Sequence, residues 1–320
     1  AQLENEVGVI NAAVGAAYAG ARTMIGTSGG GFALMTEGLS LAAQSEIPLL
    51  IVESQRTGPA SGVPTYTEQA DLSFVLSAGH GDITKFVAAP GDAEEAFLWS
   101  GKLLNLSWKY QTPSVLLIDK EISESSFDFD PEMLEKIEKE KPKLWNGEED
   151  YNRYKDEGDG VSPLAFPGQK AVVKSNSYEH DEFGLTVEDR EKVEEMQDKR
   201  KRKFEKMRKE VSNLEAVKSY GDEDSKKAII AWGSTKGAAK EAASQLGFKL
   251  IQPILLEPFP ERQMRKALKG IKKKALVEAN QSAQLGKLLN QHGIQVDKKV
   301  LKYNGRPFTP QEIAKELKDL

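Results

Sequence analysis

The chain has 320 residues, of which 44 are Lys or Arg and 49 are Asp or Glu, giving a formal net charge of −5. This balance argues against nucleic acid and against an anionic membrane surface as partners. The chain has no cysteine, which excludes disulfides, a thiol nucleophile and the ligands of an ordinary iron–sulfur cluster, so any redox metal centre has to lie on another chain.

Two further features bear on metals and on location. Three histidines in the whole chain argue against a protein-built zinc site. No apolar run approaches the roughly 20 residues that span a bilayer, and no signal peptide is visible. We therefore expect no membrane partner and a cytoplasmic location.

Residues 1–125 alternate between helix-like and strand-like segments. The segments IPLLIVE and SVLLI are continuous apolar runs, which are typical of strands buried on both faces of a parallel sheet. The expected helix at 92–110 has an acidic first turn, and negative charge at the N-terminus of a helix is stabilised by the helix dipole. The expected helices span residues 4–21, 32–44 and 92–110, and the expected strands span residues 22–25, 47–53, 84–88 and 114–118.

Residues 126–224 are highly charged and poor in large aliphatic side chains. Two prolines and two glycines at 159–169 predict an ordered or semi-ordered loop. Residues 187–217, which include DREKVEEMQDKRKRKFEKMRKE, predict a long exposed helix or a helical hairpin. Because acidic and basic residues are interleaved there, we interpret this charge run as a solvated face and not as a nucleic-acid-binding surface.

Residues 225–320 return to alternating strands and helices. The expected strands span residues 227–232, 248–256 and 274–278, and the expected helices span residues 236–246, 261–268 and 282–291. This order predicts a compact parallel sheet of about three to four strands with right-handed crossovers.

The whole chain is therefore predicted to be α/β, with two doubly wound parallel-sheet domains joined by a charged, partly helical linker. The expected domains are residues 1–125 and 225–320, and the linker is residues 126–224.

Two loops that follow strands are candidates for binding a ligand. Residues 27–31 (TSGGG) stand between a strand and a helix, where glycines let backbone amides approach a ligand or another chain. Their spacing fits neither the dinucleotide fingerprint nor a P-loop, so a plain tight turn is equally compatible. Arg56 follows the strand at 47–53, at the end where ligands of open parallel sheets bind, although an ordinary surface arginine also fits.

Other titratable residues stay ambiguous on the residues alone. Glu4 and Glu6 lie at the start of the first expected helix, where the helix dipole is sufficient to explain acidic side chains. His80 lies between two glycines, where a simple loop hydrogen bond is the plainer interpretation. Asp181 and His180 belong to a dense titratable cluster, but contiguous residues do not all face one point, which argues against a metal site.

Seven stretches together resemble the α subunit of 2-oxoacid:ferredoxin oxidoreductases. They are LENEVGVINAAVGAAYAGAR at 3–22, TSGGGFALMTEG at 27–38, ESQRTGPASGVPT at 53–65, EQADLSFVLSAGHGD at 68–82, DGVSPLAFPG at 159–168, SYEHDEFG at 177–184 and VEANQSAQLGKLL at 277–289. The resemblance covers nearly the whole chain in the family's order. The QR-x-GP-x-S-G-x-PT and GHG elements together are specific to it.

The resemblance implies a division of labour between subunits. Residues 1–125 would be the pyrimidine-binding domain of a thiamine-diphosphate enzyme, and residues 225–320 would be similar to the C-terminal domain of transketolases. A separate β subunit would hold the diphosphate, its Mg²⁺ and a [4Fe–4S] cluster, which agrees with the absence of cysteine here. The implied activity is oxidative decarboxylation of a 2-oxoacid to acyl-CoA and CO₂, with coenzyme A as co-substrate and electrons passing to ferredoxin. A γ subunit or domain is a further expected partner.

The resemblance also assigns roles to single residues. Counting back from the turn at Thr27 places the family's activating glutamate on Glu6 rather than on Glu4. There it would hydrogen-bond the aminopyrimidine ring of the cofactor and so help the thiazolium ring lose its proton. The further implied assignments are Arg56 and Ser61 for the substrate carboxylate, Ser28 and Gly29 for the cofactor, and, with weaker support, His80 and Asp181. No residue of this chain is assigned to a metal.

The sequence departs from the family's pattern in two places. An upstream stretch with a YPITP-like motif is missing, since the chain opens at Ala1 on the helix that carries the glutamate. We therefore expect processing, truncation or a segment supplied from elsewhere, and the activity of this polypeptide is open. The usual Gly-Pro-Gly of the turn is Gly29-Gly30-Gly31, which should be more flexible.

Two other functions stay compatible with the sequence. One is a subunit of a different thiamine-diphosphate enzyme, such as a 2-oxoacid dehydrogenase complex or a transketolase. The other is a non-catalytic homologue that kept the fold. Which 2-oxoacid is used, and the subunit stoichiometry, are not set by these patterns.

Overall fold

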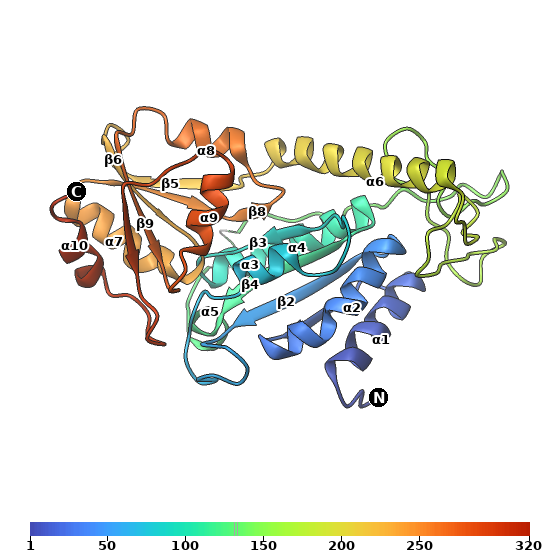
Figure 1. Cartoon of the computed structure of the whole chain (residues 1–320), viewed down its shortest axis with the longest axis horizontal. Helices are drawn as coiled ribbons and strands as arrows, with labels where there is room; N and C mark the ends of the chain where they lie inside the picture. Colours follow the sequence, from blue (N-terminus) through green and yellow to red (C-terminus); the bar gives the residue numbers. More distant parts are fainter. Residues whose placement is uncertain (131, 133) are drawn as a thin grey trace.

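The computed structural model describes residues 1–130, 132 and 134–320. Within these residues the strands form two five-stranded sheets. Figure 1 shows the sheets side by side, with helix α6 (Arg190–Glu210) running along the top of the view. The α/β class and the two predominantly parallel sheets are as the sequence predicts.

The first sheet is built from apolar strands that are buried on both faces. Its order is β1 (Met24–Thr27), β2 (Leu49–Gln55), β4 (Pro113–Asp119), β3 (Phe86–Ala88) and β8 (Leu255–Glu257), and all neighbours are parallel except β3 and β8. Side chains alternate across a strand, so Leu49 and Ile51 of β2 join one core cluster and Leu50 joins another. Each face of the sheet therefore has its own helical cover.

Helices α1 (Glu6–Tyr18) and α2 (Gly30–Gln44) supply the cover on one face, and α4 (Ala93–Tyr110) supplies it on the other. Asn5 caps α1 by accepting the Gly8 N–H at 2.9 Å, and Asp92 caps α4 by accepting the Glu95 N–H at 2.9 Å. Short helices α3 (Leu72–Ser77) and α5 (Lys120–Glu124) follow β2 and β4. The acidic start predicted for the helix at 92–110 thus includes a true cap.

The second sheet has the order β10 (Lys298–Leu301), β9 (Lys273–Glu278), β6 (Lys227–Ala231), β7 (Lys249–Pro253) and β5 (Val217–Gly221), with only β5 antiparallel to its neighbour. Helices α7 (Lys236–Leu246) and α10 (Pro310–Leu317) pack on one face. Helices α8 (Glu261–Ala267) and α9 (Gln284–Gln291) pack on the other, in a core cluster that continues into the first sheet. The two halves therefore share one apolar core.

Three predicted elements differ from the structure. The expected strand at 248–256 breaks near Ile254, whose N–H bonds to the Ala216 carbonyl at 2.9 Å. Its second part, β8, crosses to the first sheet. The second sheet has five strands rather than three to four, because β5 and β10 were not predicted. Residues 187–217 form one helix followed by a short 3₁₀ turn (Val211–Asn213), so the hairpin alternative is wrong.

The charge pattern predicts an exposed helix at α6, but one face of this helix is buried. Lys199 and Lys203 are only 1% exposed, and both ammonium groups bind the Glu46 carboxylate, which is equally buried. The Lys199 contact measures 2.5 Å. Burial alone would raise the pKa of Glu46, but the two ammonium groups outweigh burial and hold that pKa far below its usual range. The charged helix is thereby tied to the end of α2.

We expect Glu46→Gln to lower the free energy of unfolding by about 3–5 kcal/mol, because two buried ammonium groups would lose their counter-charge. The midpoint of urea unfolding measures this effect. Glu37→Gln, on the exposed side of α2, is the control and should change stability by no more than about 0.5 kcal/mol. A loss below about 1 kcal/mol for Glu46→Gln would show that the cluster contributes no more than a surface ion pair.

Candidate active site

A cavity of about 860 Å³ opens at the edge of the first sheet, beyond the carboxyl ends of its strands. Ligands of open parallel sheets bind at this edge. The cavity is lined by the start of α1, the turn between β1 and α2, the ends of β2 and β4, and α5. The lining residues are Gln2, Glu4, Asn5, Glu6, Val9, Gly26, Thr27, Ser28, Gly31, Met35, Val52, Ser54, Arg56, Ile118, Lys120, Ser123 and Glu124.

Glu6 is the first residue of α1, and its side chain is half-buried against the turn that begins α2. A Cβ atom on Gly31 would lie 2.8 Å from Glu6 Oε1 and would also collide with the Thr27 hydroxyl. The turn can therefore come this close to Glu6 only with glycine at position 31. Glu4 lines the same cavity but is exposed, so the structure places Glu6 and not Glu4 against the turn.

The turn at 27–31 brings two predicted cofactor residues to the start of α2. Ser28 lines the cavity, and its hydroxyl is buried without a hydrogen-bond partner in the described part of the chain. Gly29 adopts a positive φ of 40°, and its N–H donates to Glu53 Oε1 at 2.6 Å. Gly29 does not itself line the cavity. An unsatisfied buried hydroxyl at this point is a natural contact for a bound ligand.

Arg56 lines the cavity just past the end of β2, and its side chain is half-buried. Within residues 1–130, 132 and 134–320, no carboxylate lies within ion-pair distance of its guanidinium. Ser61 is exposed on the loop that follows and does not line this cavity. The Arg306 guanidinium from the second half stacks on Tyr66 of that loop, 3.4 Å from the ring centre.

The two weaker candidates lie elsewhere. His80 is exposed, bonds to the Ser40 hydroxyl, and lines a different cavity beside α2. The Asp181 carboxylate accepts the N–H groups of Phe183 and Leu185 and so closes a local turn. The structure therefore brings neither residue to the cavity of Glu6 and Arg56. His180 is fully buried and stacks on Tyr154 at 3.7 Å between ring centres.

Some cavity residues were not found from the sequence. Ser54 and Ser123 bond to each other through their hydroxyls at 2.8 Å, and Lys120 pairs with Glu124 on α5. Their only sequence signal is position, since each follows or ends a predicted strand. Among the described residues, no group of His, Cys, Asp or Glu has the geometry to hold a metal ion.

Comparison with known proteins identifies the family. A family model described as pyruvate flavodoxin/ferredoxin oxidoreductase, thiamine diphosphate-binding, matches residues 1–200, which is more than half of the chain. The chain belongs to this family.

Relatives of the pyruvate ferredoxin oxidoreductase family match over the whole chain. The 2-oxoacid:ferredoxin oxidoreductase subunit alpha of Saccharolobus solfataricus is 40% identical over 99% of this chain and 52% of its own length. The 2-oxoacid:ferredoxin oxidoreductase 2, subunit alpha, of Aeropyrum pernix is 39% identical over 99% of this chain and 51% of its own length. The chain thus spans about half the length of the curated relatives it matches.

Solved structures agree with this assignment. The 2-oxoglutarate:ferredoxin oxidoreductase from Magnetococcus marinus, determined with 2-oxoglutarate, coenzyme A and succinyl-CoA bound, matches with a TM-score of 0.89 and 32% identity, covering 99% of this chain and 56% of that one. A split-gene transketolase matches with a TM-score of 0.55 and 11% identity, covering 97% and 79%, which shows a shared fold alone. None of the described helices combines the length and apolar character that a bilayer crossing requires; the cytoplasmic location stays a prediction.

The residues at the cavity fit the thiamine diphosphate that the family binds. Gly31 lets the Glu6 carboxylate pack against the turn, and the Ser28 hydroxyl has no hydrogen-bond partner among the described residues. A carboxylate and a hydroxyl are groups that an aminopyrimidine ring can bond. Nothing among the described residues of this cavity offers a cluster of carboxylates for a metal ion.

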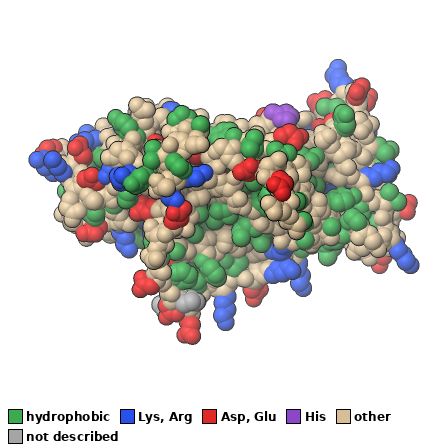
Figure 2. Space-filling view, turned by 90° about the horizontal axis from the view of Figure 1, so that it is seen from below, with side chains coloured by type: hydrophobic (Ala, Val, Ile, Leu, Met, Phe, Trp, Pro, Cys, Tyr) green, Lys and Arg blue, Asp and Glu red, His purple; other side chains and the backbone are tan. Residues whose placement is uncertain are grey.

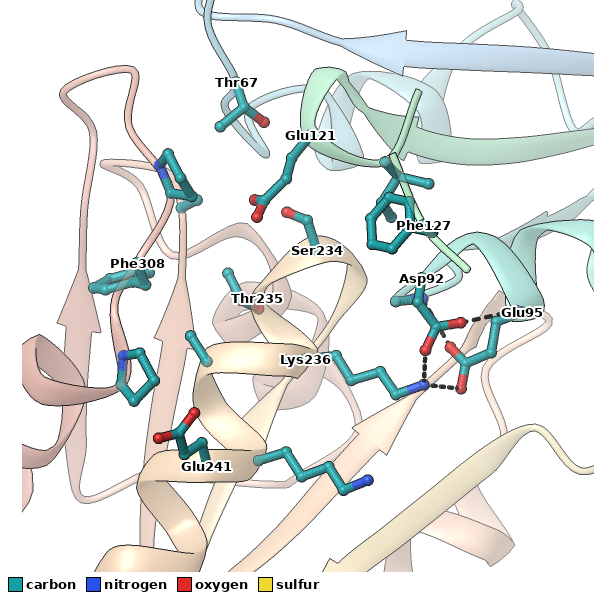
Figure 3. Close-up of a pocket in the computed structure, with 18 of the residues that line it drawn as sticks. Thr67, Asp92, Glu95, Glu121, Phe127, Ser234, Thr235, Lys236, Glu241 and Phe308 are labelled. Carbon is teal, nitrogen blue, oxygen red and sulfur yellow. Dashed lines mark hydrogen bonds and ion pairs between the residues drawn. The ribbon is translucent and has the colours of Figure 1, made fainter. Parts of the chain in front are cut away.

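A second cavity, of about 600 Å³, lies where the two halves meet (Figure 3). Lys236, the first residue of α7, reaches across to Glu95 at 2.7 Å and also binds Asp92. The Ser234 hydroxyl donates to the buried Asp119 carboxylate at the end of β4. These partners are far apart in the sequence, so no local pattern predicts them. They hold the second half against the strand ends that form the candidate active site.

Helix α5 separates the two cavities. Its residues Lys120, Ser123 and Glu124 face the cavity of Glu6, whereas Glu121 and Ile122 line the junction cavity. Burial, and then the Asp119 carboxylate, raise the pKa of Glu121 to about 7. The junction therefore carries a carboxyl group that is partly protonated near neutral pH.

We expect Gly31→Ala to weaken thiamine diphosphate binding at least tenfold, because the new methyl group collides with Glu6 and Thr27 and moves them. A loss of about 1.4 kcal/mol of binding free energy is enough for a tenfold effect. Gly30→Ala is the matched control, because a Cβ at Gly30 meets nothing within 4 Å. The measurement is activation of the purified complex by added thiamine diphosphate. Equal effects of the two variants would contradict the proposed closeness of Glu6 to the turn.

Proposed function

We propose that this chain is the α-subunit portion of a 2-oxoacid:ferredoxin oxidoreductase, which oxidatively decarboxylates a 2-oxoacid to acyl-CoA and CO₂ and passes electrons to ferredoxin. The observation that carries the proposal is that one open cavity holds both Glu6, packed against a glycine turn, and Arg56, which has no ionic partner in the part of the chain that the structure describes. The family match and the similarity to subunits of that name support it. The relative of known structure is reported with 2-oxoglutarate and coenzyme A, so 2-oxoglutarate is the first substrate to test.

Glu6 would activate the cofactor. When bound, thiamine diphosphate supplies the carbanion chemistry that decarboxylation needs. The Glu6 carboxylate would accept a hydrogen bond from a protonated nitrogen of the aminopyrimidine ring. It would also exchange that proton with the ring during the reaction. This hydrogen bond strengthens when water is excluded from the cavity. Ser28 would donate its hydroxyl, which is without a partner in the described part of the chain, to the cofactor, and the turn at Gly29 would position that hydroxyl.

Arg56 would bind the carboxylate of the 2-oxoacid. A guanidinium forms two parallel hydrogen bonds with a carboxylate, and this fork fixes the orientation of the substrate as well as its charge. Arg56 is half-buried, so the attraction is less screened than on an open surface. Ser61, on the loop that begins at Arg56, is exposed and lies outside this cavity, so we propose Arg56 alone as the residue that binds this carboxylate.

A partner subunit would complete the site. We propose that a β subunit holds the diphosphate, its Mg²⁺ and a [4Fe–4S] cluster, because this chain has no cysteine to bind iron. A γ subunit or domain and ferredoxin would be further partners. Helix α1 is apolar on most sides, which is typical of a helix that is covered on both faces.

Exposed apolar side chains beside the cavity fit such a cover. Val7, in the first turn of α1, is 44% exposed, and Leu34, near the start of α2, is 53% exposed. Figure 2 views the molecule from below and shows apolar side chains spread between the charged groups on that face. We propose that the β subunit docks over the start of α1 and α2 and brings the cofactor to Glu6.

We expect Glu6→Gln to lower kcat at least 100-fold in the assembled complex, because proton transfer by a placed carboxylate contributes about that factor or more. Methyl-viologen reduction with several 2-oxoacids measures it. Glu4→Gln is the matched control, since Glu4 lines the same cavity but is exposed. Unchanged turnover in Glu6→Gln would indicate a non-catalytic role, and NAD reduction without ferredoxin would favour another class of thiamine enzyme.

We expect Arg56→Met to raise the KM for the 2-oxoacid by about 10- to 100-fold, since a hydrogen bond to a charged group is worth about 1.5–3 kcal/mol. Arg56→Lys keeps the charge but loses the fork, so it should recover only part of the loss. Arg262→Met, on the exposed side of α8 and outside this cavity, is the control. If Arg56→Met changes kcat and leaves KM untouched, Arg56 does not bind the substrate carboxylate.

A further inference from the structure

Glu53 is a buried acid beside the candidate active site that the proposed mechanism leaves without a role. It lies near the end of β2 and is paired in register with Thr27, the last residue of β1. Its side chain is fully buried, with 0% exposure. It therefore sits directly beneath the turn that carries Ser28 and Gly29.

The two carboxyl oxygens of Glu53 have different surroundings. Oε1 accepts the Gly29 N–H at 2.6 Å. Oε2 is buried and has no hydrogen-bond partner among the described residues. An ionised carboxylate left with one bare oxygen in the protein interior is costly, whereas a carboxylic acid carries its proton there and is far cheaper to bury.

The charges around Glu53 come from three elements. Burial is the largest effect, and the pKa of Glu53 is raised to about 8. The Gly29 N–H at the start of α2 and Arg56 past the end of β2 both lower this pKa, whereas the Asp71 carboxylate before α3 raises it. The dipole of α2 also favours the ionised form. Burial outweighs these, because water cannot reach the carboxyl group.

We propose that Glu53 is a positioning residue that stays protonated in the working enzyme, so that it fixes the Gly29 turn without neutralising Arg56. As an acid it still accepts the Gly29 N–H and so holds the turn that faces Glu6 and the cofactor. As an acid it also leaves the guanidinium of Arg56 free for the substrate carboxylate. This role rests on the proposed function of Arg56.

The arrangement has a consequence at alkaline pH. Well below pH 8 the Glu53 acid is mostly neutral, so Arg56 keeps its attraction for a carboxylate. Above that pH Glu53 ionises and its negative charge competes with the substrate for Arg56. If only the protonated form binds the substrate well, the KM for the 2-oxoacid should rise by up to about tenfold for each pH unit above 8.

The test uses the intact complex with Glu53→Gln and Glu53→Ala. The Gln amide oxygen can still accept the Gly29 N–H, and the amide never ionises. Glu53→Gln should therefore keep the neutral-pH KM at high pH and abolish the alkaline rise. Glu53→Ala loses the bond to Gly29 and should weaken thiamine diphosphate binding already at pH 7. Glu37→Gln, exposed on α2, is the control and should keep the alkaline rise.

A second readout does not depend on turnover. The infrared difference spectrum between the wild type and Glu53→Gln should contain the carbonyl band of a protonated carboxylic acid at pH 7, and this band should disappear well above pH 8. A carboxylate band at pH 7 instead would overturn the proposal.

The two readouts separate failure of this inference from failure of the proposed function. If the complex turns over no 2-oxoacid, the proposed function fails, and the infrared band still decides whether Glu53 is protonated. If turnover is normal but the alkaline rise of KM is the same in the wild type and in Glu53→Gln, the link to Arg56 is refuted.

Discussion

The close approach of α1 to α2 sets the position of Glu6, and two glycines of α2 make it possible. A Cβ on Gly31 would collide with Glu6, and a Cβ on Gly38 would lie 2.5 Å from Ile10 Cγ2. Positions 31 and 38 are two turns apart and therefore lie on the same face of α2. Side chains at positions 31 and 38 would push the two helices apart, and the carboxylate of Glu6 would then move away from the turn that it contacts. The rest of the site is arranged around that contact.

The loop that carries Arg56 depends on the second half of the chain. Gln69, at the far end of this loop, donates from its amide to the Trp232 carbonyl at 2.7 Å and accepts the Ala279 N–H at 2.9 Å. Arg306 holds Tyr66 from the same side. The loop that begins at Arg56 is thus held by residues that follow the strand ends of the second sheet. Residues 225–320, which are remote from Arg56 in the sequence, therefore support the loop that we propose binds the substrate.

Much of the fold could be predicted from local patterns, because buried parallel strands are short apolar runs and the helices between them are periodic. Strands β2, β4, β6 and β9 and helix α7 follow from such patterns. The predictions that were wrong concern elements with partners far away in the sequence. Strand β8 leaves its expected sheet because it pairs with β3, and the lysines of α6 are buried because they bind the buried Glu46 carboxylate. Burial of a charge is decided by its tertiary counter-ion, which no window of sequence contains.

The site was predicted less evenly. Residues that follow strand ends, such as Ser28 and Arg56, could be located from topology and from the resemblance. Ser61, His80 and Asp181 were also expected there, but the fold directs their side chains to solvent, to Ser40 and to a local turn. Glu53 was counted as part of an apolar strand, so the sequence predicted no role for it. A carboxyl group within an apolar strand is itself a signal of a special environment, because its burial requires a charged or hydrogen-bonding partner or a bound proton.

The proposed docking of a partner and the proposed role of Glu6 would be physically coupled. In the chain alone Glu6 is half-exposed to water, which competes for its hydrogen bonds and screens its charge. A partner surface that covers Val7 and Leu34 would exclude that water and lower the local dielectric, so the same carboxylate would interact more strongly with a bound ring. The free energy of docking and the strength of the Glu6 contact would then rise together. If Glu6 activates the cofactor fully only when it is covered, the reactive form of the cofactor would be confined to the complete complex, where substrate and electron acceptor would both be present.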